Sequence, residues 1–182
     1  VHAEAEGLTP APPEATHLLI VADPDGDLPE GNEQNNVLAL ALPTAKTGKI
    51  TGGGTLDPGR QNFGFVINTR LKDGVPTFQG NLQFNDRELG VRLHSTSLDT
   101  LQIADDGIAT FTGEAKVNGA TGYRFTVIVR DGGEPGRGND TFQLIVEGPG
   151  GFSYDSDDVA SNGGQLQGGN IQFHFSSGKK RR

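Results

Sequence analysis

The chain has 182 residues, of which only 33% are apolar, and it contains 28 glycines and ten prolines. This composition excludes a helical bundle and favours many short strands joined by turns. It has no cysteine, which excludes disulfides, cysteine-type zinc sites and thiol nucleophiles. The net charge of −8 opposes nucleic-acid binding, because basic side chains that neutralise phosphates supply most of that affinity.

The N-terminal third is predicted to contain a linker and a hairpin. Residues 1–16 are rich in Ala, Glu and Pro and lack periodicity, so we expect a flexible arm. Two apolar runs of strand length, 17–22 and 37–42, flank an acidic loop and predict the paired strands of a hairpin, within a segment spanning 17–45. No apolar run approaches the about 20 residues of a membrane helix, so membrane insertion is not expected.

Residues 46–176 are predicted to form one β-domain, in which apolar and polar residues alternate with a period of two from Lys49 onward. In a strand this pattern marks one buried and one solvated face. The apolar members of successive runs are Phe63, Phe65 and Ile67; Phe78, Leu82 and Phe84; Val91 and Leu93; Phe111, Ala115 and Val117; Tyr123, Phe125, Val127 and Val129; Phe142, Leu144 and Val146; and Ile171, Phe173 and Phe175. Turn signals such as "VNGATG" separate the runs. We therefore predict an all-β fold, an antiparallel meander forming a β-barrel or β-sandwich, followed by a basic tail at 177–182.

Two stretches resemble known bacterial modules. "HLLIVADPDGDLPEGNEQNNVLALAL" (residues 17–42) resembles the closing hairpin of the CARDB domain, an immunoglobulin-like cell-adhesion-related module. Residues 49–175, with "KITGGGTL", "NFGFVI" and "GGNIQFHF", resemble a β-rich module of large secreted bacterial proteins. The resemblance implies a secreted, extracellular or cell-surface setting and a binding or structural role, and it carries no catalytic residues.

The loop between the two N-terminal strands is a candidate calcium site. Hard oxygen donors at alternating positions suit Ca²⁺. The loop departs from an EF-hand, because Leu28 and Gln34 occupy positions that need Gly and Glu. The alternative is that these side chains only bond their own backbone in turns. The candidate ligands are Asp23, Asp25, Asp27, Glu30 and Glu33.

Two further segments of the chain are rich in acidic residues. "YDSDD" places Asp155, Asp157 and Asp158 close together, and like charges at this spacing favour a cation or solvent between them. We expect either a second calcium site or a solvated loop. In "RDGGEPGRGND" (residues 130–140) the acids are expected to serve turn chemistry instead.

Signals for catalysis are weak. In "HSTS" a serine follows a histidine directly, and neighbours in a strand point to opposite faces, which argues against a nucleophile–base pair. His94 and His174 fall on the polar phase of their strands, and we expect them to be exposed. The chain is therefore not expected to be an enzyme.

The expected function is an extracellular structural or adhesive β-module, stabilised by calcium. Strands of the N-terminal hairpin could pair with other copies of the chain or with neighbouring domains and build filaments by β-strand addition. The alternative is a monomeric carbohydrate-binding or accessory module of a larger surface protein. That alternative lacks an aromatic sugar platform, since the chain has no tryptophan and two tyrosines.

Overall fold

The computed structural model describes residues 17–21, 37–41, 48–57, 60–72, 75–104, 107–159 and 163–175. They form two separate β-sheets, which belong to different compact units. In the smaller sheet β1 (His17–Val21) pairs antiparallel with β2 (Val37–Ala41). The two predicted N-terminal strands are thus confirmed.

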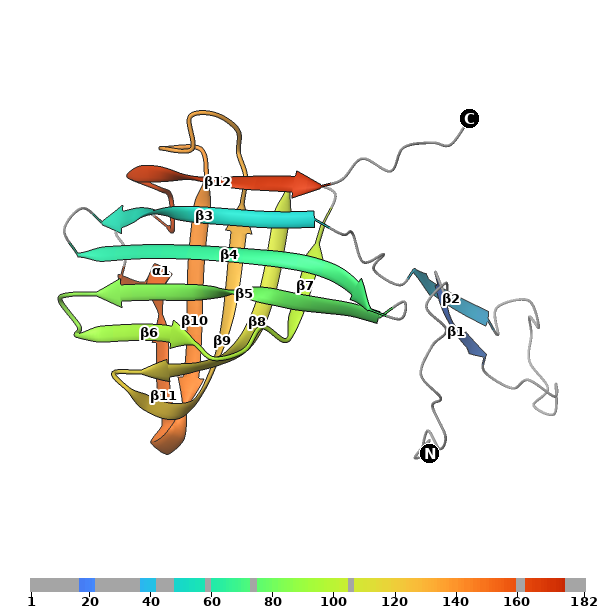
Figure 1. Ribbon diagram of the computed structural model, residues 1–182, viewed down its shortest axis with the longest axis horizontal. Coiled ribbons are helices and arrows are strands. Elements are labelled where there is room, and N and C mark those ends of the chain that lie inside the picture. Colours follow the sequence, from blue (N-terminus) through green and yellow to red (C-terminus); the bar gives the residue numbers. More distant parts are fainter. Residues whose placement is uncertain are drawn as a thin grey trace, which may run out of the picture. The chain divides into compact units, whose positions relative to one another are not determined.

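The larger sheet has ten strands, and its chain order is nearly its spatial order (Figure 1). Its strands are β3 (Gly48–Asp57), β4 (Gln61–Lys72), β5 (Val75–Asp86), β6 (Val91–Ser95), β7 (Thr100–Ile103), β8 (Ile108–Val117), β9 (Ala120–Arg130), β10 (Thr141–Gly148), β11 (Phe152–Asp155) and β12 (Gly168–Phe175). A 3₁₀ turn (Pro149–Gly151) precedes β11, and the short helix α1 (Ser156–Val159) follows it. The predicted all-β antiparallel meander is confirmed, with two departures: β12 returns to pair with β3, and β6 pairs with β8 instead of β7.

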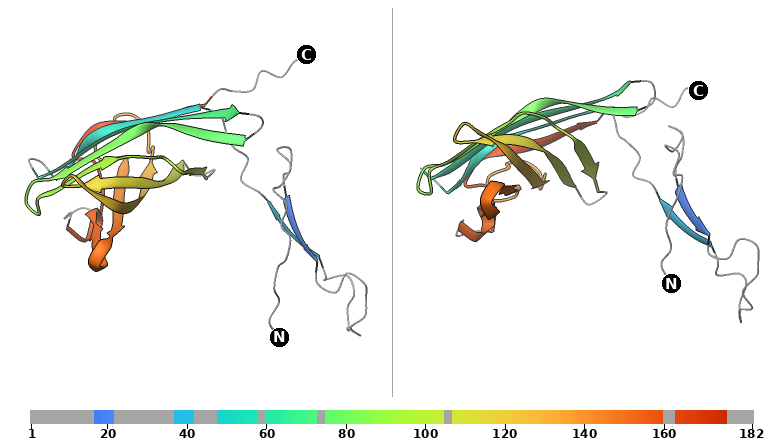
Figure 2. Two further views of the ribbon diagram at one scale, coloured as in Figure 1. Left: turned by 60° about the horizontal axis from the view of Figure 1, so that its bottom comes forward. Right: turned by 90° about the horizontal axis from the view of Figure 1, so that it is seen from below.

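The sheet folds over on itself at β8. The half of β8 near its C-terminus pairs with β6, and the half near its N-terminus pairs with β7. Strands β12, β3, β4, β5 and β6 form one layer, and β7 to β10 run crosswise to it in a second layer (Figures 1 and 2). At the corner Gly113 lies so close to the Ser97 carbonyl and the Phe125 ring that a Cβ atom would clash with both. This corner therefore depends on glycine.

The sheet is open, with β11 and β12 at its two ends. Of the two predicted architectures the barrel is therefore wrong, and the layers pack as a sandwich. A bridge joins Thr141, the first residue of β10, to Gln165 ahead of β12, and the loop 131–140 covers the free edge of β12. There Asp140 accepts the Ile171 N–H at 2.7 Å and Asp131 accepts the Phe173 N–H at 3.2 Å. These carboxylates occupy edge groups that could otherwise pair with another strand.

Aromatic side chains from both layers fill the core. Phe63 of β4 stacks on Phe142 of β10 with ring centroids 3.9 Å apart, and Phe65 meets Phe111 of β8 at 5.2 Å. Alternation in the sequence predicted these buried faces, since strand residues two apart share a face. The "TGGGT" run lies in β3, where a Cβ at Gly54 would clash with the Gly168 carbonyl. Glycine at this position therefore permits a close approach of the two backbones.

Candidate functional site

The outer face of the first layer has a groove of about 310 Å³. This volume is at the small end of the about 300–1,000 Å³ usual for ligand sites. The groove spans β4, β5 and β6, and it is lined by Asn62, Phe63, Gly64, Gln83, Phe84, Asn85, Arg92 and His94. Because Phe63 and Phe84 point into the core, the strand alternation turns the polar members of this set toward solvent.

Strand register places the polar side chains in pairs. Gln83 lies opposite His94, and Asn85 lies opposite Arg92, across the β5–β6 ladder. Residues directly opposite on one face have Cβ atoms about 4.5–5.5 Å apart, so each pair can contact one ligand. The turn residue Asn118 fixes the Arg92 backbone, since its Oδ1 accepts the Arg92 N–H at 3.0 Å and its own N–H bonds the Arg92 carbonyl at 2.8 Å.

Gly64 leaves the floor of the groove open. A Cβ atom at this position would meet nothing within 4 Å, and the backbone there is not in the left-handed region. A larger side chain would therefore be compatible with the strand, and it would project into the groove that Gly64 lines. The sheet tolerates the glycine at some cost, because glycine is unfavourable in strands.

The polar side chains of the groove lack protein partners. Within the described part of the chain, the side chains of Asn62, Gln83, Asn85, Arg92 and His94 form no hydrogen bond or ion pair. Some carboxamides of the same domain are paired, since Gln143 bonds Asp155 and Gln172 bonds Glu134, whereas Asn81 and Gln102 are unpaired among the described residues like those of the groove. The groove thus combines donors and acceptors that are available to a ligand.

The groove is also free of negative charge in its lining. Strands β4, β5 and β6 contain a single carboxylate, Asp86, and it is fully buried on the inner side. Arg70, Lys72 and Arg92 give these strands positive charge, in a chain whose net charge is −8. The local charge balance therefore favours a neutral or anionic ligand.

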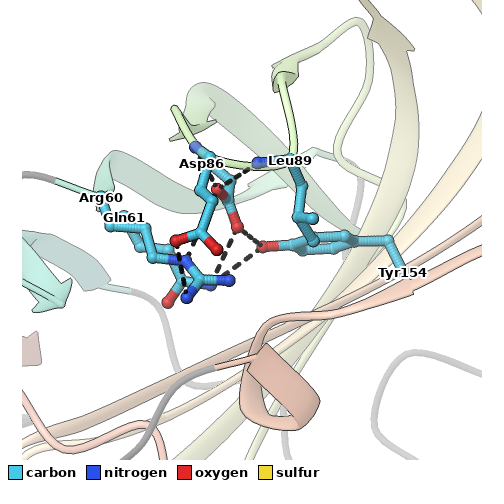
Figure 3. A network of polar contacts seen from close by, with 6 residues as sticks. Arg60, Gln61, Asp86, Leu89 and Tyr154 are labelled. Carbon is cyan, nitrogen blue, oxygen red and sulfur yellow. Dashed lines mark hydrogen bonds and ion pairs between the residues drawn. The ribbon is translucent and has the colours of Figure 1, made fainter.

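A polar network centred on Gln61, Asp86 and Tyr154 (Figure 3) is buried on the inner side of the sheet. The Tyr154 hydroxyl donates to Asp86 Oδ2 at 3.0 Å, and the Gln61 amide donates to both the same oxygen at 3.2 Å and the Tyr154 oxygen at 3.1 Å. Asp86 Oδ1 accepts the backbone N–H groups of Glu88 and Leu89 at 2.9 and 3.0 Å. The network joins the start of β4 and the end of β5 to β11.

The network also sets the protonation states of its members. Burial alone would raise the pKa of Asp86, but hydrogen bonds from Leu89, Gln61, Tyr154 and Glu88 outweigh it and hold the pKa below its usual value. Burial, the hydrogen bond to Asp86 and its charge raise the pKa of the Tyr154 hydroxyl. Asp86 is therefore an ionised acceptor and Tyr154 a protonated donor at neutral pH.

The network fixes residues that are adjacent to the groove. Gln61 precedes Asn62, and Asp86 follows Asn85, so anchoring the two buried side chains holds the backbone from which the two outward side chains project. A charge-assisted network of this kind restricts the motion of the strand ends. The backbone at these two edges of the groove is therefore held in place, which lowers the backbone part of the ordering cost of ligand binding.

The predicted calcium ligands fall in two places. Asp23, Asp25, Asp27, Glu30 and Glu33 lie outside the described residues. Asp155 ends β11, where both of its carboxylate oxygens accept the Gln143 amide, at 3.1 and 3.0 Å. Asp157 and Asp158 lie in α1.

The three acids around α1 differ in environment. Asp157 Oδ1 is buried and has no hydrogen-bond partner, whereas Asp158 is exposed. Burial, then the charges of Asp155 and Asp158, raise the pKa of Asp157. Among the described residues no group of three or more His, Cys, Asp or Glu side chains is arranged to hold a metal ion. Calcium binding by these residues stays a prediction.

The "YDSDD" segment is partly buried and is not the fully solvated loop expected as the alternative to a calcium site. Tyr154 and Ser156 are buried, and the Ser156 hydroxyl accepts the Leu144 N–H at 2.9 Å. In the loop 131–140, the expected turn chemistry is confirmed: Asp131 accepts the N–H of Gly133, and Asp140 that of Gly132. His94 and His174 are both exposed, as predicted.

Sequence reasoning did not identify the groove. Its residues are the polar, outward-facing members of the stretches "QNFGF", "NLQFND" and "VRLH". Only the apolar, inward-facing members of these stretches were predicted to have a role, as core residues. The available signal was the run of carboxamides without acids on these polar faces.

Comparison of the chain with protein-family models, with curated proteins and with solved structures found no match. The resemblance of residues 17–42 to the CARDB hairpin therefore stays a prediction. No helix among the described residues is long and apolar enough to cross a membrane.

Proposed function

We propose that this chain is a non-catalytic carbohydrate-binding module of a secreted or cell-surface protein, and that the groove on β4, β5 and β6 is its ligand site. The observation that carries the proposal is the set of five converging polar side chains without protein partners. Carboxamides present a donor and an acceptor each, which suits the paired hydroxyl groups of a sugar. Recognition would rest on hydrogen bonds, since no tryptophan or tyrosine lines the groove.

The proposal is tested by glycan-array binding of the purified chain and its Gly64→Val variant. Valine should fill the groove and favour the strand, so the variant should fold and lose binding. Arg70→Ala is the matched control: Arg70 lies on the same face of β4, six residues and about 20 Å from Gly64. Absence of glycan binding by the wild-type chain, or equal binding by the Gly64→Val variant, would contradict the proposal.

A self-assembling structural module is the second candidate. It is favoured by the two-stranded β1–β2 sheet, which forms a unit separate from the ten-stranded sheet and is marginal in isolation. Partner strands for it would come from other copies of the chain or from neighbouring domains. The capped edge of β12 makes assembly through the larger sheet less favourable.

The two candidates are separated by deleting residues 1–45. Size-exclusion chromatography and negative-stain imaging, in millimolar calcium and in chelator, should show assembly lost on deletion if the hairpin mediates it. Glycan binding should survive the same deletion if the groove is the functional site. A wild-type chain that is monomeric in both solutions would exclude the assembly function.

A further inference from the structure

We propose that the groove selects an acidic sugar, a saccharide bearing a carboxylate, and that Arg92 is the side chain that binds this carboxylate. The inference rests on the proposed carbohydrate-binding function and specifies its ligand. Its first support is charge: the lining has one arginine, one histidine and no Asp or Glu. A guanidinium binds a carboxylate in a bidentate manner, which a neutral hydroxymethyl group cannot reproduce.

Arg92 is available for this role. Within the described residues its guanidinium has no carboxylate partner, a property it shares with Arg70, Arg87, Arg130 and Arg137, whereas Arg60 pairs with Glu88 at 3.0 Å and Arg124 with Asp99 at 3.9 Å. Of these unpaired arginines, Arg92 is the one that lines the groove. Asn118 fixes its backbone by hydrogen bonds to both the N–H and the C=O group of Arg92. A charged side chain on a fixed backbone, free of internal partners, is arranged for an external anion.

The surroundings of Arg92 favour a sugar over other anions. Asn85 lies directly opposite Arg92, and Gln83 and His94 form the next pair along the ladder. These groups can bond ring hydroxyls while the guanidinium binds the acid, whereas an extended polyanion needs a row of cations. The net charge of −8 also opposes a long polyanion, so a single acidic residue in the groove fits the charge distribution better.

A second groove provides a comparison on the opposite layer. It measures about 220 Å³ and is lined by Thr112, Arg124, Phe125, Thr126, Ile145 and Glu147. Its arginine is already paired with Asp99, and Glu147 adds negative charge to the lining. An anionic ligand is therefore expected in the groove of Arg92 and not in this one.

The test is isothermal titration calorimetry at low salt with two matched pairs of oligosaccharides. One pair is the trimers of galacturonate and galactose, and the other is an oligosaccharide ending in either glucuronate or glucose. At least one acidic member should bind about 10- to 100-fold more tightly than its neutral partner, the effect of one charge-assisted hydrogen bond. Arg92→Gln should abolish this preference and leave weak binding of both sugars. Gly64→Val should abolish all binding, and Arg70→Ala should preserve the preference.

The outcomes separate this inference from the proposed function. Equal affinity for acidic and neutral sugars, or a preference that persists in Arg92→Gln, would overturn the inference and leave a carbohydrate-binding groove. Failure of every sugar in these titrations and on the glycan array would overturn both. Circular dichroism of each variant verifies that loss of binding is not loss of fold.

Discussion

Removal of one hydroxyl from the buried network should produce a large and specific loss of stability. Tyr154→Phe deletes the donor to Asp86 at 3.0 Å and an acceptor of the Gln61 amide. A hydrogen bond to a charged group contributes about 1.5–3 kcal/mol and a neutral one about 1 kcal/mol. Because backbone donors still hold Asp86, we expect the free energy of unfolding to fall by about 2–3 kcal/mol.

The measurement is urea denaturation at neutral pH, followed by far-ultraviolet circular dichroism. Tyr123→Phe is the matched control: the chain has only these two tyrosines, and Tyr123 packs edge-on against Phe152 with no hydrogen bond from its hydroxyl among the described residues. Its cost should stay within about 0.5 kcal/mol. Equal effects of the two substitutions would refute the network's role in stability.

The pH dependence of the same variant gives an independent check. The pKa of Asp86 is lower in the folded protein, so its ionised form contributes stability above its unfolded pKa, and this stability is lost as the pH falls through the folded pKa. The stability contributed by the Tyr154 hydrogen bond to Asp86 should likewise be lost as the pH falls and Asp86 becomes protonated. The difference between wild type and Tyr154→Phe should therefore be full at neutral pH and shrink in acid, and a difference that grows in acid would contradict the assignment.

Three further substitutions test other parts of the structure. Asp157→Asn should raise the melting temperature at neutral pH, because the raised pKa of Asp157 makes its ionised form unfavourable in the folded state. The gain in melting temperature should disappear in acid, where the wild-type carboxyl is protonated. It should also disappear in calcium if the ion binds the ionised Asp157 of the wild-type chain. Gly113→Ala should cost about 1–3 kcal/mol or prevent folding, since its Cβ clashes with the Ser97 carbonyl, and an unchanged urea midpoint would argue against the corner. Asp140→Ala should destabilise the sandwich and promote association through the uncapped edge of β12, and size-exclusion chromatography that shows only stable monomer would contradict this.

The buried faces of the strands were predictable because a strand repeats every two residues, so Phe63 and Phe65 indicate their environment locally. The layers and the groove depend on register instead. Asn62 and Arg92 are far apart in the chain, and only the pairing of β4, β5 and β6 brings them to one groove. The alternation within one strand does not show which strand it pairs with, and the turn sequences indicate only that neighbouring strands are connected.

The hydrogen-bond partners of the acidic residues also depend on strand pairing. Asp155 and Asp157 are candidate calcium ligands because clustered carboxylates suit calcium. In the structure both carboxylate oxygens of Asp155 accept the amide of Gln143 from the neighbouring strand. That partner lies 12 residues away and belongs to a strand pair that the sequence did not predict. Likewise, the role of Asp140 at the edge of β12 requires the return of the last strand across the sandwich.

The most direct test of the binding account is a nuclear magnetic resonance titration of the isotope-labelled chain with the tightest sugar found by calorimetry. The account predicts that the side-chain amide signals of Asn62, Gln83 and Asn85 and the guanidinium signal of Arg92 shift together, while those of Gln143 and Asn139 stay unchanged. Shifts confined to another surface, or spread evenly over the chain, would contradict a ligand site on the outer face of β4, β5 and β6.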